Sequence, residues 1–166
     1  MNKLKFALLL FILLPNFAIC QEATQYFTLN TKVGNVKIPG SWEQLNTMND
    51  SGQTYLKNSE GIVIAIAQNP RKAYSFFNSK KSDFENVKLF YTWDSDYMKQ
   101  NKYKTDKLME NSKSEYIIWK YNDGTLDNVF LFGSNKENFL NILVYTNIWN
   151  EEEKIKFLEN IYMLNK

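Results

Sequence analysis

The sequence predicts an α+β domain in which an antiparallel β-sheet lies between two helices, an α/β/α sandwich. Strand-like segments recur through the chain, two helical segments interrupt and end that series, and one central segment is apolar on both of its faces. A strand of that kind belongs in the middle of a sheet that is covered on both sides. We assign residues 1–20 to a signal peptide and residues 21–166 to a single α+β domain, which is long enough to bury its own core.

The first half of the domain is predicted to contain two pairs of short strands. Segments 26–30 and 32–39 have strand character around a polar turn, and segments 53–58 and 61–69 are expected to form a hairpin across residues 58–61. The second arm of this hairpin is the most apolar strand of the chain. Its isoleucines face one side of the sheet and its smaller residues face the other: Ile62, Ile64 and Ile66 against Val63, Ala65 and Ala67.

A change from strand period to helix period predicts a helix over residues 82–100. Ser82 precedes Glu85 by three residues, which is the spacing of a capping box. Apolar residues then follow at helical intervals, as expected for a face that packs on the sheet. They are Phe84, Val87, Tyr91 and Met98, with Phe90 and Trp93 beside them.

Four further strands and a final helix complete the predicted fold. Turn-rich connections separate the strands, so an antiparallel meander is the simplest topology. The strands are residues 102–110, 114–122, 127–135 and 138–147. Asn150 then caps a helix with the apolar stripe Ile155, Leu158, Ile161 and Tyr162. Glu151, Glu152 and Glu153 lie at the positive end of its dipole, and because they fan around the axis we do not interpret them as a metal or acid cluster.

Two segments resemble the Mog1/PsbP-like families. "VKIPGSWEQL", residues 36–45, looks like the strand, Ile-Pro, Gly and Trp near the start of that fold, and residues 138–164 are similar to its last strand and final helix. The resemblance implies the same sandwich and a binding or assembly role without catalysis, and NTF2-like and cystatin-like sheets are the competing folds. It implies no photosynthetic or nuclear partner, because no motif for either is visible. We expect Trp42 in the core, with an exposed ligand contact as the alternative.

The first residues have the pattern of a secretory signal. Two lysines precede the apolar residues 6–14, which are too few to span a bilayer, and the small residues Ala18 and Cys20 favour cleavage before Gln21. We therefore expect a bacterial protein that is exported to the periplasm or secreted. Two alternatives stay open: a lipoprotein anchored through Cys20, against which the bulky Ile19 argues, and an uncleaved anchor.

Composition restricts the chemistry of the processed chain. The sequence has 20 basic and 18 acidic residues, and removal of the two lysines in the signal leaves 18 of each. This balance argues against nucleic-acid binding, and membrane contact is expected only through a lipid on Cys20. Histidine is absent, and cleavage removes the single cysteine, so the chain lacks an imidazole base, a thiol nucleophile and the usual zinc ligands. We expect no enzyme activity, no catalytic residues, no cofactor and no metal.

The connection into the first helix is the best candidate for partner recognition. Its proposed contact residues are Arg71, Lys72, Tyr74 and Phe77. Cations beside aromatic rings can hold an anionic or aromatic partner, and connections at such positions often carry recognition. The alternative is that Phe76 and Phe77 cover the sheet edge while the lysines stay solvated. We accordingly expect a monomeric, non-enzymatic binding or accessory protein of the cell envelope that acts on a protein or a cell-surface component.

The alternative function is that of a carrier for a small apolar ligand. The first helix and the sheet would then enclose a pocket lined by Phe84, Tyr91, Trp119 and Phe132. A filled core would disfavour this function, and a pocket on the order of several hundred cubic ångströms would favour it. Asp94 and Asp96 could bind calcium or cleave glycosides only if they converged in a cleft. Because residues two apart on a helix point away from each other, catalysis by this pair is not expected.

Overall fold

The structure is a computed structural model and describes residues 25–166. The predicted signal peptide and Cys20 lie outside these residues. The described chain runs from strands to a helix, back to strands and into a second helix. The expected α+β class, with an antiparallel sheet flanked by helices, is confirmed.

The larger sheet has seven antiparallel strands in the order β3-β4-β5-β9-β8-β7-β6. Their bounds are β3 Glu43–Thr47, β4 Thr54–Lys57, β5 Val63–Pro70, β6 Lys104–Asn111, β7 Tyr116–Asn122, β8 Asp127–Asn135 and β9 Asn138–Tyr145. The predicted hairpin is formed by β4 and β5, and the predicted meander by β6 to β9. β5 pairs with β9 along its whole length, which places it inside the sheet as its apolar pattern predicts.

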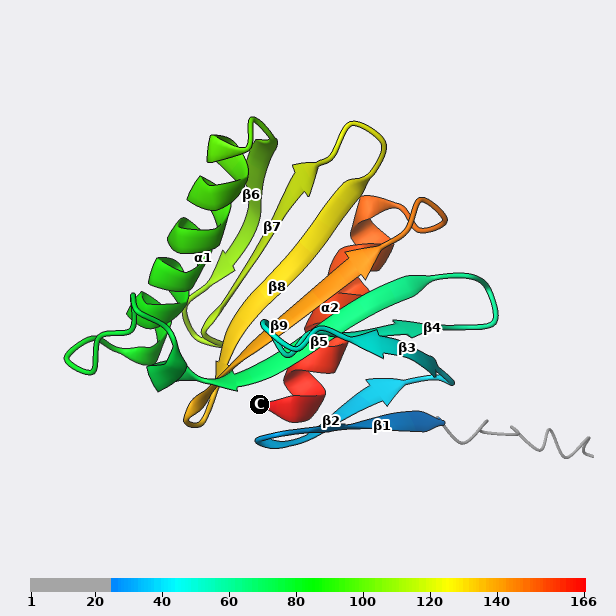
Figure 1. Ribbon diagram of the computed structural model, residues 1–166, viewed down its shortest axis with the longest axis horizontal. Helices are drawn as coiled ribbons and strands as arrows, with labels where there is room; N and C mark the ends of the chain where they lie inside the picture. The colour runs from blue at the N-terminus through cyan, green and yellow to red at the C-terminus, as the bar shows by residue number, and fades with distance from the viewer. Residues whose placement is uncertain (1–24) are drawn as a thin grey trace, which may run out of the picture.

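The helices α1, Asp83–Gln100, and α2, Glu151–Asn165, cover opposite faces of this sheet. Figure 1 shows α2 passing behind β8, β9 and β5, whereas α1 lies along the side of the sheet formed by β6 and β7. A short 3₁₀-helix, Arg71–Ala73, follows β5 in the connection that leads to α1. Because α1 contacts β6, β7 and β8, it covers only one half of its face of the sheet.

Both helices begin as their sequences predict. Ser82 accepts a hydrogen bond from the Glu85 backbone N at 3.2 Å, and the Glu85 carboxylate accepts one from the Ser82 backbone N at 2.8 Å. Asn150 and Glu153 form the same reciprocal pair at α2. These capping boxes satisfy amide donors that a helix start otherwise leaves unpaired.

The α2 face is a closed aliphatic layer. The isoleucines of β5 pack there against the neighbouring strands and α2, and Tyr162 is fully buried in the same layer. A second, two-stranded sheet, formed by β1, Tyr26–Thr31, and β2, Gly34–Pro39, packs beside α2. It is fastened by Asn165, whose amide bonds the backbone N and O of Lys37 at 2.7 and 2.8 Å.

The structure differs from the predicted strand set in two places. β3 was not expected, because its five residues are all exposed and lack the alternation of a half-buried strand. The β1–β2 hairpin forms a sheet of its own instead of joining the large one. Trp42 lies between β2 and β3 in the sequence and is in the core as predicted. Its Nε1 donates to the Pro39 carbonyl at 2.8 Å, and its ring centre lies 5.7 Å from that of Phe157.

Candidate functional site

A solvent-accessible groove of about 610 Å³ lies on the α1 face, next to the half of the sheet that α1 leaves uncovered. Its walls and floor come from α1, from the connection before it, from β4, β5 and β7 to β9, and from the segment between β3 and β4. We call it the α1 groove. Its volume falls within the range of sites that hold small organic ligands.

The floor of the α1 groove leaves space for a ligand because β5 presents the small side chain of Ala67 there. Ala67 lines the groove and has Asn141 of β9 as its cross-strand neighbour, with Leu143 of β9 two residues further along. The isoleucines of β5 point to the opposite face because successive residues of a strand alternate. One strand thus fills the α2 layer and leaves space on the α1 side.

Aromatic rings form the α1 side of the groove. The ring of Tyr74 lies 4.9 Å from that of Phe90 and 6.2 Å from that of Trp93, both on α1. Tyr121 of β7 and Phe130 of β8 continue the wall, with ring centres 5.8 Å apart. Trp93 is 50% exposed, so part of its ring is accessible at the edge of the groove.

Asparagine side chains fix the connection that carries Tyr74. Buried Asn86 of α1 bonds both the backbone N and O of Asn78, at 2.9 and 3.0 Å, and so ties this segment to the helix. Asn69 of β5 donates to the Tyr74 hydroxyl at 3.1 Å and to the Ser51 carbonyl at 2.8 Å. Asn69 therefore links the two rims of the groove, which are the segment before β4 that contains Ser51 and the connection that carries Tyr74.

Asp94 is the ionisable side chain that α1 directs into the groove. It lies one helical turn from Phe90 and from Met98, both of which line the groove with it. Burial raises the pKa of its carboxyl group from 3.8 to about 6. Among residues 25–166, no donor or cation forms a hydrogen bond or an ion pair with this carboxylate, so its desolvation is not compensated.

Two tyrosine hydroxyls lie close enough to Asp94 to respond to its charge. Burial raises the pKa of Tyr74, a hydrogen bond from Asn69 opposes that rise, and the Asp94 charge adds to it. Burial raises the pKa of Tyr121 to about 12, with further contributions from Asp123, Tyr103 and Asp94. Both hydroxyls therefore stay protonated, and the groove gains no further charge from them near neutral pH.

The four residues proposed for partner recognition do not share one surface. Tyr74 lines the groove, Lys72 is exposed, and Arg71 is buried. Phe77 is partly buried, and the Arg71 guanidinium carbon lies 5.7 Å from the centre of its ring.

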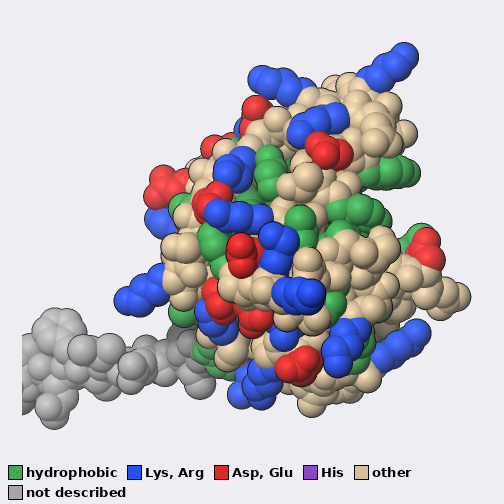
Figure 2. Space-filling view, turned by 90° about the vertical axis from the view of Figure 1, so that its left-hand side faces the viewer, with side chains coloured by type: hydrophobic (Ala, Val, Ile, Leu, Met, Phe, Trp, Pro, Cys, Tyr) green, Lys and Arg blue, Asp and Glu red, His purple; other side chains and the backbone are tan. Residues whose placement is uncertain are grey.

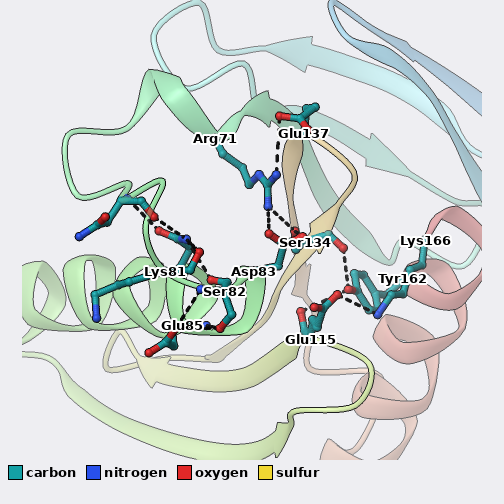
Figure 3. A network of polar contacts seen from close by, with 12 residues as sticks. Arg71, Lys81, Ser82, Asp83, Glu85, Glu115, Ser134, Glu137, Tyr162 and Lys166 are labelled. Atoms are coloured by element: carbon teal, nitrogen blue, oxygen red, sulfur yellow. Dashed lines mark hydrogen bonds and ion pairs between the residues drawn. The ribbon is translucent and has the colours of Figure 1, made fainter.

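Arg71 belongs to a network that joins the two layers (Figure 3). It forms an ion pair with Asp83 of α1, lies 3.6 Å from the Glu137 carboxylate and approaches the Ser134 hydroxyl at 3.4 Å. The Tyr162 hydroxyl of α2 donates to the Ser134 carbonyl at 2.8 Å. These contacts give Arg71 a structural role, since a buried charge needs such partners.

The four residues predicted to line a carrier pocket lie beside the groove and not in it. Trp119 and Phe132 are fully buried under α1, where Phe132 stacks on Phe90 with ring centres 4.1 Å apart. Tyr91 meets Trp119 edge-on at 5.8 Å, and Lys88 lies 4.6 Å from the ring of Phe84. The groove begins where this filled layer ends.

Asp94 and Asp96 do not converge. Asp96 is exposed and pairs with Lys99 at 2.9 Å, one turn along the outer side of α1. Within residues 25–166 no three acidic side chains gather at a point that could hold a metal ion, and no helix is long and apolar enough to span a membrane. On the α1 side of the described molecule, basic and acidic side chains are interspersed, with hydrophobic side chains visible between them (Figure 2).

The helix period of α1 singles out Asp94, although its spacing from Asp96 does not. Val87 and Phe90 are the buried apolar residues of α1, and the next position of that stripe is Asp94. A charged residue at a position where the helix period demands an apolar one indicates a functional or strained site. The helix period thus places Asp94 on the side of α1 that faces the sheet. That this side borders a groove is visible only in the folded structure.

Comparison of the sequence with protein-family models and with curated proteins gave no match.

Proposed function

We propose that this chain is a non-enzymatic binding protein that holds a small organic ligand in the α1 groove. The observation that carries the proposal is the groove itself: about 610 Å³ of accessible space with aromatic rings along its α1 side and the small Ala67 on its floor. Sites of this size are typical for small ligands, and the lining here combines aromatic rings with polar side chains. The Mog1/PsbP-like resemblance agrees with a role in binding but names no ligand.

The chemistry of the groove supports binding over catalysis. Nucleophilic and acid–base catalysis needs two groups within hydrogen-bond reach of each other and of the substrate. Asp94 forms no hydrogen bond or ion pair with another side chain among residues 25–166, and the Tyr74 hydroxyl is held by the amide of Asn69. The groove therefore offers surface and hydrogen-bond acceptors for a ligand.

The place of action is the bacterial cell envelope or the exterior, and this part of the proposal rests on the sequence pattern of residues 1–20. Mass spectrometry of the protein from its host tests it. Cleavage before Gln21 is expected, and a diacylglyceryl thioether on Cys20 would make the protein an anchored one instead.

Ligand binding is tested with the neutral fluorophore Nile red and the purified protein. We expect its emission to rise and shift to the blue when it enters the groove. Ala67→Phe places a ring on the groove floor and should abolish the change. Val63→Phe is the matched control, because Val63 lies on the same face of β5 but does not line the groove.

Thermal unfolding of both variants accompanies the titration. Loss of binding in Ala67→Phe alone, with both variants folded, supports the groove as the site. Equal Nile red emission from the wild type and Ala67→Phe, or no emission change with the wild type, would contradict the proposed function.

A further inference from the structure

The charge of the α1 groove has one sign. Its lining contains the carboxylates Asp50 and Asp94 and neither lysine nor arginine. Asp50 lies at the exposed rim in the segment between β3 and β4, whereas Asp94 lies on the inward side of α1. A groove whose charged side chains are all carboxylates is electrostatically suited to a cation.

Asp94 lacks the partner that a partly buried carboxylate needs. Its neighbours on the helix face are Phe90 and Met98, which are apolar, and it forms no hydrogen bond or ion pair with residues 25–166. Removing a carboxylate from water without a partner is unfavourable for folding, and such groups are concentrated at functional sites. At neutral pH, above its raised pKa of about 6, Asp94 is ionised and able to accept a donor.

A second acceptor without a partner lies at the groove. The Asn141 Oδ1 atom is buried and has no hydrogen-bond donor among the described residues, and Asn141 lines the groove from β9. Buried polar atoms are nearly always paired, so an unpaired one requires an explanation. Asn141 therefore adds an unpaired polar side chain to the lining of the groove, beside the unpaired carboxylate of Asp94.

The aromatic wall suits the same kind of ligand. Tyr74, Phe90 and Trp93 form a cluster with ring centres 4.9 to 6.3 Å apart. Aromatic faces attract organic cations and also bury flat apolar bodies.

We propose that the ligand of the α1 groove is an organic amine, a protonated ammonium group on a flat apolar body, and that Asp94 is its counter-ion. The aromatic cluster holds the apolar body, and Asp94 accepts hydrogen bonds from the ammonium group. This inference rests on the proposed function, because it assumes that the groove binds a small ligand, and it adds the chemical class of that ligand.

The test uses three probes that share one ring system and differ in charge. Naphthylmethylamine is cationic at neutral pH, naphthylmethanol is its neutral counterpart, and naphthoate is an anion. We measure their affinities for the purified protein by calorimetry at pH 7.5, a pH chosen so that Asp94 is ionised. The amine is expected to bind roughly tenfold more tightly than the alcohol, as one charge-assisted hydrogen bond provides, and the anion more weakly than both.

Two variants of the same helix locate the effect. Asp94→Asn keeps the shape of the side chain and should remove the preference for the amine, so that the amine and the alcohol bind with similar affinity. Asp96→Asn is the matched control, because Asp96 is exposed on the outer side of α1 and pairs with Lys99. It should bind all three probes as the wild type does.

The outcomes separate this inference from the function on which it rests. Binding of the amine and the alcohol with equal affinity, or an amine preference that survives in Asp94→Asn, would overturn the assignment of Asp94 and leave the proposed function standing. Preference for the anion would overturn the ligand class. If no probe binds and Nile red also fails to bind, the proposed function itself is wrong.

Discussion

Replacing Asp94 by Asn is expected to stabilise the ligand-free protein at neutral pH. Burial without a partner raises the pKa of this carboxyl group from 3.8 to about 6. A pKa difference of one unit corresponds to about 1.4 kcal/mol. The rise therefore corresponds to at most about 3 kcal/mol of folding free energy that is lost when Asp94 ionises. The Asn side chain has nearly the same shape and avoids the cost of burying a charge.

The stabilisation should depend on pH in a defined direction. Because the pKa of Asp94 is higher in the folded than in the unfolded chain, its contribution to stability is complete below about pH 4 and is lost as the pH rises through about 6. The difference in unfolding free energy between Asp94→Asn and the wild type should therefore be small at about pH 4 and reach its maximum above about pH 7. Tyr74 and Tyr121, the titratable groups near Asp94, have raised pKa values and do not ionise in this range.

Urea unfolding of the wild type, Asp94→Asn and Asp96→Asn across this pH range measures the effect. Asp96→Asn removes an exposed pair on the same helix and should change stability by about 0.5 kcal/mol or less at every pH. A difference between Asp94→Asn and the wild type that stays constant with pH would refute the reasoning, as would a lower stability of Asp94→Asn at high pH.

Four other changes have defined outcomes. A Cβ at Gly133 would overlap the Tyr162 ring, so Gly133→Ala should lower the unfolding free energy by about 1–3 kcal/mol in urea titrations; an unchanged midpoint would mean that α2 packs less tightly on β8. Tyr162→Phe removes the hydroxyl whose single proton is shared between the Ser134 and Ser114 carbonyls, at 2.8 and 2.7 Å, and should cost about 1–3 kcal/mol by the same measurement, with a loss below about 0.5 kcal/mol contradicting a buried hydrogen bond. Ser82→Ala removes one half of the α1 capping box and should cost about 1 kcal/mol, seen as a lower melting temperature; wild-type stability would show that the cap contributes nothing. Naphthylmethylamine should bind more weakly as the pH falls through the pKa of Asp94, about 6, and calorimetry that finds constant affinity from about pH 5 to 8 would contradict the ion pair.

Most of the secondary structure could be predicted because local chemistry determines it. The capping boxes at Ser82 and Asn150 mark both helix starts, and the two-sided apolar pattern of residues 61–69 identifies an internal strand. β3 could not be predicted, because it is an exposed edge strand whose pairing with β4 leaves no trace in its hydrophobic pattern. The separate β1–β2 sheet depends on packing against α2, which is a tertiary property.

The candidate site was predictable only in part. The aromatic setting of Tyr74 indicates a recognition residue, and Tyr74 lines the groove. The nearby Arg71 is drawn inward by Asp83, a partner that sequence spacing does not reveal. Phe84 and Trp119 have the apolar character of a pocket wall, yet that same character lets them pack into a filled layer. The filled layer under α1 ends where α1 stops covering the sheet. The types of the residues in the sequence do not show where that edge lies.

The alternation along β5 separates two kinds of mutational outcome by a single residue. Substitutions at Ile64 or Ile66 act on the layer that keeps the molecule folded, whereas Ala67 borders the space in which a ligand would lie. Under the proposed function, variation at Ala67 would therefore change what the groove accepts, while Ile64 and Ile66 preserve the packing of the α2 layer.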